Sequence, residues 1–139
     1  MKNRILGIDY GSRRTGIAIG DAQLRLAAPF ELFEDLDDRR LVERICRLIE
    51  RENVGVVVCG LPLNMDGTLG PQALRTERFI ELLERASARR VQRMDERLSS
   101  HDAQSRLAGH FTRQQKRRRV DAVAAARILQ DYLDTHAQP

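Results

Sequence analysis

Acidic residues stand at three places where the pattern of the sequence changes. Asp9 ends the first apolar run of the chain, and Asp95 and Glu96 end the last one. Asp121 opens the helical pattern near the C-terminus. Carboxylates that converge repel one another unless a cation lies between them, and hard oxygen ligands of this kind suit Mg²⁺ or Mn²⁺. Two such ions can activate a water molecule and stabilise the leaving oxygen of a phosphodiester, so these acids predict metal-dependent hydrolysis.

Each acid also has a purely structural interpretation. Asp9 could simply begin a turn, but an acid at the end of a buried strand costs free energy unless it has a partner. Asp121 could be a favourable charge in the first turn of a helix. Asp95 and Glu96 are neighbours on a strand, so their side chains point to opposite faces and only one is expected to join a site. The pattern leaves open which of the two it is.

The elements that must position these acids follow from the hydrophobic periodicity. Apolar runs and alternation predict strands at 4–9, 16–20, within 24–33, at 54–60 and at 91–94. Helical spacing predicts helices over 38–52 and 71–88, from Ser99 or Ser100 to about Leu107, and from Val120 onwards.

These elements predict one α/β domain over residues 1–139. Its mixed five-stranded sheet would combine a three-stranded antiparallel meander with parallel strands, flanked by helices. In open α/β sheets, ligands bind outside the carboxyl ends of the parallel strands, which is where the acids would meet.

Cationic residues cluster in a predicted loop directly before Asp121. The loop contains Arg113, Lys116, Arg117, Arg118 and Arg119. Its charge is expected to attract phosphate with salt-sensitive affinity and no base preference. The Gly-rich turn from Asp9 to Gly16 adds Arg14 as a further phosphate ligand. Aromatic residues make up only 4% of the chain and Trp is absent, which favours duplex or junction substrates over stacking on unpaired bases.

The composition is that of a soluble globular protein. The chain has 139 residues, of which 42% are hydrophobic and 32% charged, and its formal net charge is +4. No apolar run approaches the roughly 20 residues that a membrane span needs. The N-terminus shows no cleavage site of a signal peptide, so a cytoplasmic location is expected. Cys46 and Cys59 lack metal-type spacing and are expected to be core thiols.

Four motifs give the chain a resemblance to a known family. They are Gly7–Asp21, Val58–Thr68, Asp95–Ser100 and Asp121–Leu129. In this order and spacing the chain resembles the YqgF/RuvX family of pre-16S ribosomal RNA nucleases, which are also described as Holliday junction resolvases. The Leu-Pro-Leu-Asn-Met-Asp-Gly loop of residues 61–67 is close to diagnostic by itself. Small departures exist, since Gly20 stands where many members have Ser, and Ser99 and Ser100 where Thr is frequent.

The resemblance implies a ribonuclease H-like fold and a catalytic site. By the family's pattern, Asp9, Glu96 and Asp121 are the metal ligands and catalytic acids, which selects Glu96 over Asp95. They would hold two Mg²⁺ or Mn²⁺ ions. Arg14, Asn64 and the basic loop would position phosphates. The implied function is maturation of the 5′ end of precursor 16S ribosomal RNA in the bacterial cytoplasm, on free RNA or on a pre-ribosomal particle.

Three alternatives remain beside this hypothesis. A resolvase of four-way DNA junctions would use the same acids and should act as a two-fold dimer. A non-catalytic RNA-binding factor for ribosome assembly would keep the fold without cutting. An ATPase of the actin and sugar-kinase type would share the turn from Asp9 to Gly16, but such proteins clamp nucleotide between two domains. The sequence leaves open RNA against DNA, and a monomer against a homodimer.

Overall fold

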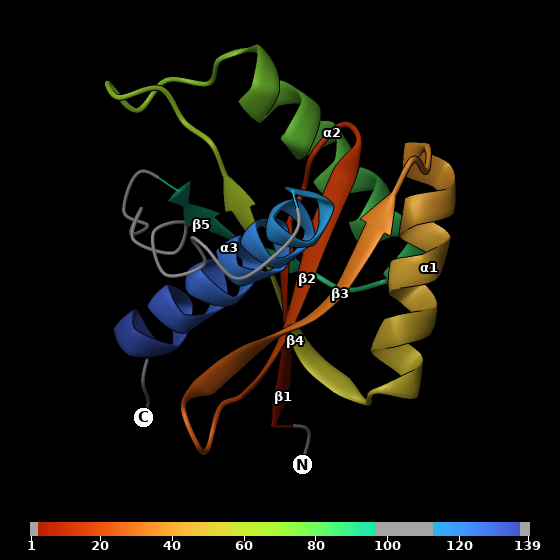
Figure 1. Ribbon diagram of the computed structural model, residues 1–139, viewed down its shortest axis with the longest axis vertical. Coiled ribbons are helices and arrows are strands. Elements are labelled where there is room, and N and C mark those ends of the chain that lie inside the picture. The colour runs from red at the N-terminus through yellow and green to blue at the C-terminus, as the bar shows by residue number, and fades with distance from the viewer. Residues whose placement is uncertain (1–2, 97–112, 137–139) are drawn as a thin grey trace.

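Five strands form one mixed sheet in the order β3-β2-β1-β4-β5 (Figure 1). The computed structural model describes residues 3–96 and 113–136, with backbone alone for 113–121. The strands are β1 (Arg4–Asp9), β2 (Arg14–Asp21), β3 (Leu26–Glu34), β4 (Val54–Leu61) and β5 (Val91–Asp95). β1, β2 and β3 pair antiparallel, whereas β4 pairs parallel with both β1 and β5. The predicted meander with added parallel strands is therefore confirmed, and β3 is an edge strand as expected.

Helices cover both faces of this sheet (Figure 1). The helices α1 (Asp38–Arg51) and α2 (Pro71–Ser87) pack on one face, and α3 (Arg113–Thr135) packs on the other. None of the described helices is both long enough and apolar enough to cross a membrane. Asp37 is the N-cap of α1, and its carboxylate accepts a hydrogen bond from the Arg40 backbone N–H at 2.8 Å. Asn53 follows this helix with a φ of 55°, a backbone conformation that Asn tolerates well.

Alternation along β1 divides the core into two layers. Leu6 and Ile8 pack with α1 and α2, whereas Ile5 packs with α3. The strand is buried on both faces, as its continuous apolar run predicts. Odd-numbered residues of β1 therefore point towards α3, and even-numbered residues point towards the other two helices.

The start of α3 corrects one prediction. The basic residues from Arg113 to Arg119 lie in the first two turns of this helix and not in a loop. The segment has no apolar stripe, so periodicity gave no helical signal there. Its Arg, Lys and Gln residues have high helix propensity, and it lacks Gly and Pro. The short helix predicted between Ser99 and Leu107 lies outside the described residues.

Gly7 sets how closely α3 approaches the sheet. A Cβ atom at this position of β1 would lie 2.8 Å from Leu129 Cβ and 3.1 Å from the Ala125 backbone oxygen. Both neighbours are fixed parts of α3, so the helix itself would have to move. The absence of a side chain on Gly7 lets α3 rest directly on β1.

We expect Gly7→Ala to lower the free energy of unfolding by about 1–3 kcal/mol, because one methyl group overpacks this contact. Urea unfolding followed by circular dichroism measures the change. An unchanged midpoint would mean that α3 can move away from β1 without cost, contrary to the close packing described above.

Candidate active site

Asp9 and Glu96 meet at the carboxyl edge of the sheet. Asp9 is the last residue of β1, and Glu96 directly follows β5. The two strands are separated by β4, yet a side-chain hydrogen bond joins Glu96 to Asp9. The two carboxyl groups are therefore close enough to interact directly. The predicted convergence of these two acids is present in the structure.

Alternation explains why Glu96 and not Asp95 lies beside Asp9. On β5, Val91 packs with α1 and α2, whereas Met94 packs with α3. Even-numbered residues of β5, and Glu96 directly after it, therefore point towards α3, as Asp9 does at the end of β1. Asp95 points the other way, although its charge still acts on Glu96. The sequence pattern left open which of the two acids lies on the same side as Asp9. The structure answers this, because α3 covers the face towards which Glu96 points.

A glycine on the intervening strand makes room for the pair. A Cβ atom on Gly60 of β4 would lie 2.8 Å from Glu96 Cγ and 2.9 Å from Glu96 Cδ. It would also lie 2.7 Å from Ile128 Cδ1 of α3. The carboxyl of Glu96 therefore extends over the bare backbone of β4, under the edge of α3.

The surroundings of Glu96 favour its neutral form. Burial raises the pKa of Glu96, and the negative charge of Asp95 raises it further, whereas the hydrogen bond with Asp9 opposes this shift. Ionising both acids would place two negative charges side by side in a half-buried site. A cation between the two carboxyl groups would remove this repulsion.

Asp121 belongs to the same region by its position on α3. The spacing of residues 121, 125 and 128 is i, i+4 and i+7, which places them on one helical face. Ile128 on that face lies over Gly60. The side chain of Asp121 lies outside the described residues, so its part in the site stays a prediction. Among the side chains that are described, no three His, Cys, Asp or Glu residues form a metal-binding group.

The two predicted phosphate ligands outside α3 have partners within the protein. Arg14 Nε lies 3.4 Å from Glu34 Oε2 of the neighbouring strand, and the two residues face each other in the β2–β3 pairing. Asn64 Nδ2 donates a hydrogen bond of 3.0 Å to Thr68 Oγ1 within the loop after β4. Both side chains stabilise local structure here. Their contact with phosphate remains a prediction, as does that of the basic residues of α3.

Tyr10 is a positioning residue that the sequence analysis missed. It follows Asp9 and points to the opposite face, where its ring stacks on Phe79 of α2 with centroids 4.4 Å apart. Its hydroxyl donates a hydrogen bond of 2.7 Å to Asp38 Oδ1 at the start of α1. The end of β1 is thereby fixed to both helices. The only signal in the sequence is an aromatic residue next to the candidate acid.

Arg93 fixes the other strand that supplies an acid. From β5 its guanidinium donates hydrogen bonds to Glu77 and Glu84 of α2, with N–O distances of 3.0 Å to each. Glu84 also accepts a hydrogen bond from the Val91 backbone N–H at 2.9 Å. This network holds β5 against α2 just before Asp95 and Glu96. A single Arg between Gln92 and Met94 gave no such indication in the sequence.

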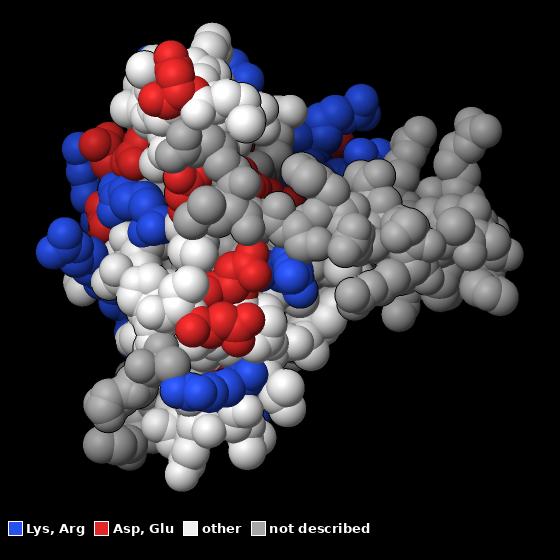
Figure 2. Space-filling view, turned by 90° about the vertical axis from the view of Figure 1, so that its left-hand side faces the viewer, with Lys and Arg blue, Asp and Glu red and all other residues white. Residues whose placement is uncertain are grey.

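Charges of both signs are interspersed over the face of the molecule nearest β5 and α3. Figure 2 shows acidic side chains along the middle of this face, with basic side chains around them. A phosphodiester that approached the described surface would therefore meet negative charge, which a bound cation would offset.

We expect Glu96→Gln to stabilise the protein at neutral pH in a chelating buffer. A carboxyl whose pKa is raised in the folded state contributes stability that is complete below the unfolded pKa of about 4.3 and is lost as the pH rises through the folded pKa. The amide cannot ionise, so the advantage of the variant should grow from pH 4 to pH 8. Thermal unfolding in EDTA measures it, with exposed Glu81→Gln as the control. A variant less stable than wild type at pH 8 would contradict the description of this pair.

Comparison with known proteins identifies the family. The model of the RuvX family, described as Holliday junction resolvase, matches residues 3–135. A protein of Chloroflexus aggregans named "Putative pre-16S rRNA nuclease" is 41% identical over 136 residues, covering 97% of this chain and 96% of the relative. A protein of the same name from Chloroflexus aurantiacus is 43% identical over 131 residues, covering 94% and 86%.

A solved structure supports the fold. The RuvC protein of T. thermophilus, in complex with a Holliday junction substrate, superposes with a TM-score of 0.59 at 12% identity, covering 96% of this chain and 94% of that one. This likeness shows the ribonuclease H-like fold that the resemblance implied. The nearly complete match to the family model, together with relatives above 40% identity, means that the chain belongs to the RuvX family, whose members are named as nucleases.

Proposed function

We propose that this nuclease hydrolyses phosphodiester bonds in structured RNA and matures the 5′ end of precursor 16S ribosomal RNA in the bacterial cytoplasm. The observation that supports it best is the contact between Asp9 and Glu96 at the carboxyl edge of the sheet. The substrate class follows from the names of the relatives. A pair of carboxyl groups at the edge of the sheet is the kind of donor set that metal-dependent hydrolysis of phosphodiesters uses.

The donor set of the site fits a divalent cation. Asp9 and Glu96 offer hard carboxylate oxygens, and they are close enough to share a proton. A divalent ion compensates two negative charges where one proton compensates one, and oxygen ligands of this kind suit Mg²⁺ or Mn²⁺. Asp121 would complete the ligand set from α3. Two ions would activate the attacking water and stabilise the leaving oxygen.

The remaining task of the chain is to hold these acids in place. Tyr10 fixes the end of β1, and Arg93 fixes β5 against α2. Gly60 leaves the space that the Glu96 carboxyl occupies. A site whose ligands are fixed before substrate binds needs little reorganisation during the reaction.

Basic residues near Asp121 would bring the substrate to the acids. Arg113, Lys116 and Arg117 share one face of α3 by their i, i+3 and i+4 spacing, and Arg118 and Arg119 continue the cluster. All five precede Asp121 on the same helix, within two turns or so. Phosphates bound there would lie next to the metal ligands, with affinity that falls as salt rises.

A four-way DNA junction is the second candidate substrate, and the description of the family model favours it. The acids would keep their roles, but paired symmetric cuts require a two-fold dimer on the junction. Light scattering that found only a monomer bound to the junction would contradict it. The ATPase hypothesis rested on the turn from Asp9 to Gly16 alone, and the family match accounts for that turn.

We expect Asp9→Asn to reduce cleavage of a 5′-extended 16S precursor by about 100-fold or more, because it removes a charged ligand from the metal site. Wild type, this variant and the control Glu81→Gln are compared in Mg²⁺ and in Mn²⁺, on the precursor and on a four-way DNA junction. Defined cuts in the RNA that only Asp9→Asn loses would support the proposal. Strong RNA binding by wild type without cleavage in either metal would instead indicate a non-catalytic assembly factor.

We expect Gly60→Ala to reduce the cleavage rate by roughly 10- to 100-fold, because displacing a catalytic group by about 1 Å has effects of this size. The added methyl group meets flexible atoms of Glu96 and Ile128, so the loss of stability should stay below about 1 kcal/mol. Single-turnover cleavage and urea unfolding measure the two effects. Because its metal site would be weakened, the variant should also need a higher Mn²⁺ concentration to reach half of its maximal cleavage rate. Cleavage at the wild-type rate would show that Glu96 does not need this space.

A further inference from the structure

Four arginines form a straight stripe along α1. Arg40, Arg44, Arg47 and Arg51 follow one another at i, i+4, i+7 and i+11, so they share one face of the helix. All four are exposed. With a rise of 1.5 Å per residue, the stripe is roughly 16 Å long and presents about one guanidinium per 5.4 Å turn. We call these four residues the α1 arginine stripe.

Most of the stripe has no partner within the described part of the chain. The guanidinium groups of Arg40, Arg44 and Arg47 take part in none of its ion pairs or side-chain hydrogen bonds. Arg51 has one contact, from its Nε to Glu52 Oε2 at 3.2 Å. Like charges at i and i+4 destabilise a helix by a few tenths of a kcal/mol per pair. An external anion would offset this repulsion.

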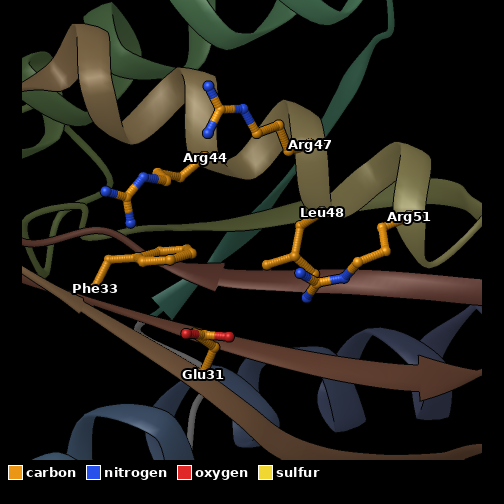
Figure 3. Close-up of a pocket in the computed structure, with 6 residues that line it drawn as sticks. All are labelled: Glu31, Phe33, Arg44, Arg47, Leu48 and Arg51. Carbon is orange, nitrogen blue, oxygen red and sulfur yellow. The ribbon is translucent and has the colours of Figure 1, made fainter.

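The stripe borders a cavity of about 270 Å³ between α1 and the edge strand β3. It is lined by Arg44, Arg47, Arg51, Leu48, Glu31 and Phe33. Figure 3 shows Arg44 and Arg51 extending from α1 towards the strand, with Phe33 and Leu48 on the wall between them. Three arginines thus line a cavity that holds a single carboxylate, that of Glu31. The cavity widens the stripe into a shallow basic groove.

The stripe begins near the acid pair and leads away from it. Its first member lies two residues after Asp38, which accepts the hydrogen bond from Tyr10 next to Asp9. The stripe also lies on the opposite side of the sheet from α3, whose first turns hold the other basic cluster. The α1 arginine stripe and the basic segment of α3 therefore lie on opposite sides of the sheet that carries the acids.

We propose that the α1 arginine stripe binds the phosphate backbone of a helical arm of the RNA substrate, outside the position of cleavage. An array about 16 Å long is too extended for one small anion, and the turn-by-turn spacing suits successive phosphates of one strand. The planar guanidinium binds phosphate oxygens in a bidentate manner, and backbone contacts need no aromatic side chains. Membrane insertion is excluded by the burial of the apolar face of α1 in the core. That the arm is RNA rests on the proposed function.

The test compares two triple variants of equal charge change. The stripe variant combines Arg40→Gln, Arg44→Gln and Arg47→Gln, and the control combines Arg78→Gln, Arg85→Gln and Arg90→Gln, which are also exposed. Each is made with Asp9→Asn to prevent cleavage. Fluorescence anisotropy measures binding to two precursor fragments: one keeps a long helical arm beside the cleavage position, and the other is trimmed to the few base pairs around it.

For the long fragment, we expect the stripe variant to lose at least about tenfold in affinity and about two units of the slope of log affinity against log salt. The control should lose less than about threefold, and the short fragment should not distinguish the variants. Equal losses for both triples, or for both fragments, would overturn the proposal, as would wild-type binding by the stripe variant. If a duplex binds through the stripe but the wild-type protein never cleaves it, the proposed function is contradicted. The assignment of the α1 arginine stripe as a phosphate-binding surface would then still stand.

Discussion

Two carboxyl groups in contact at the edge of a buried sheet are stable only while a proton or a cation lies between them. Asp9 and Glu96 are in this position, and burial raises the pKa of Glu96 so that the pair holds its proton more tightly than free carboxyls would. The repulsion between them is the reason to expect a metal ion in this family member. The packing of the rest of the molecule holds the two carboxyl groups together against this repulsion.

Close packing around bare backbone makes this contact possible. Gly7 allows α3 to rest on β1, and Gly60 leaves space over β4 in which the Glu96 carboxyl can lie. A larger residue at either position would move α3 or the acid itself. Tyr10 and Arg93 then fix the two strand ends from the opposite face, through hydrogen bonds to α1 and α2. The face that carries the two acids and the face that supports them therefore depend on each other across one layer of sheet.

Arginine residues are likewise divided between the two sides of the sheet. Arg14 and Arg93 each form ion pairs within the protein. The stripe on α1 and the first turns of α3 lie on opposite sides of the sheet. Phosphate contacts position a nucleic acid without reading its bases. If both segments bind phosphate as proposed, the substrate would be recognised by its folded shape.

The sequence by itself determined the strands and most of the helices, and it identified the candidate acids. The apolar runs of β1 and β4 and the stripe of buried residues in α1 are local patterns, and local periodicity reports which residues share a face. The family motifs then selected Glu96. Only the tertiary structure decided which face each set of residues occupies, because that depends on the helix that covers it. It thereby explained why Glu96 and not Asp95 meets Asp9, gave Arg14 and Asn64 their protein partners, and placed the basic segment before Asp121 in a helix. These outcomes rest on contacts between residues far apart in the chain, such as Gly60 with Glu96 and Gly7 with Leu129, and no local pattern contains them.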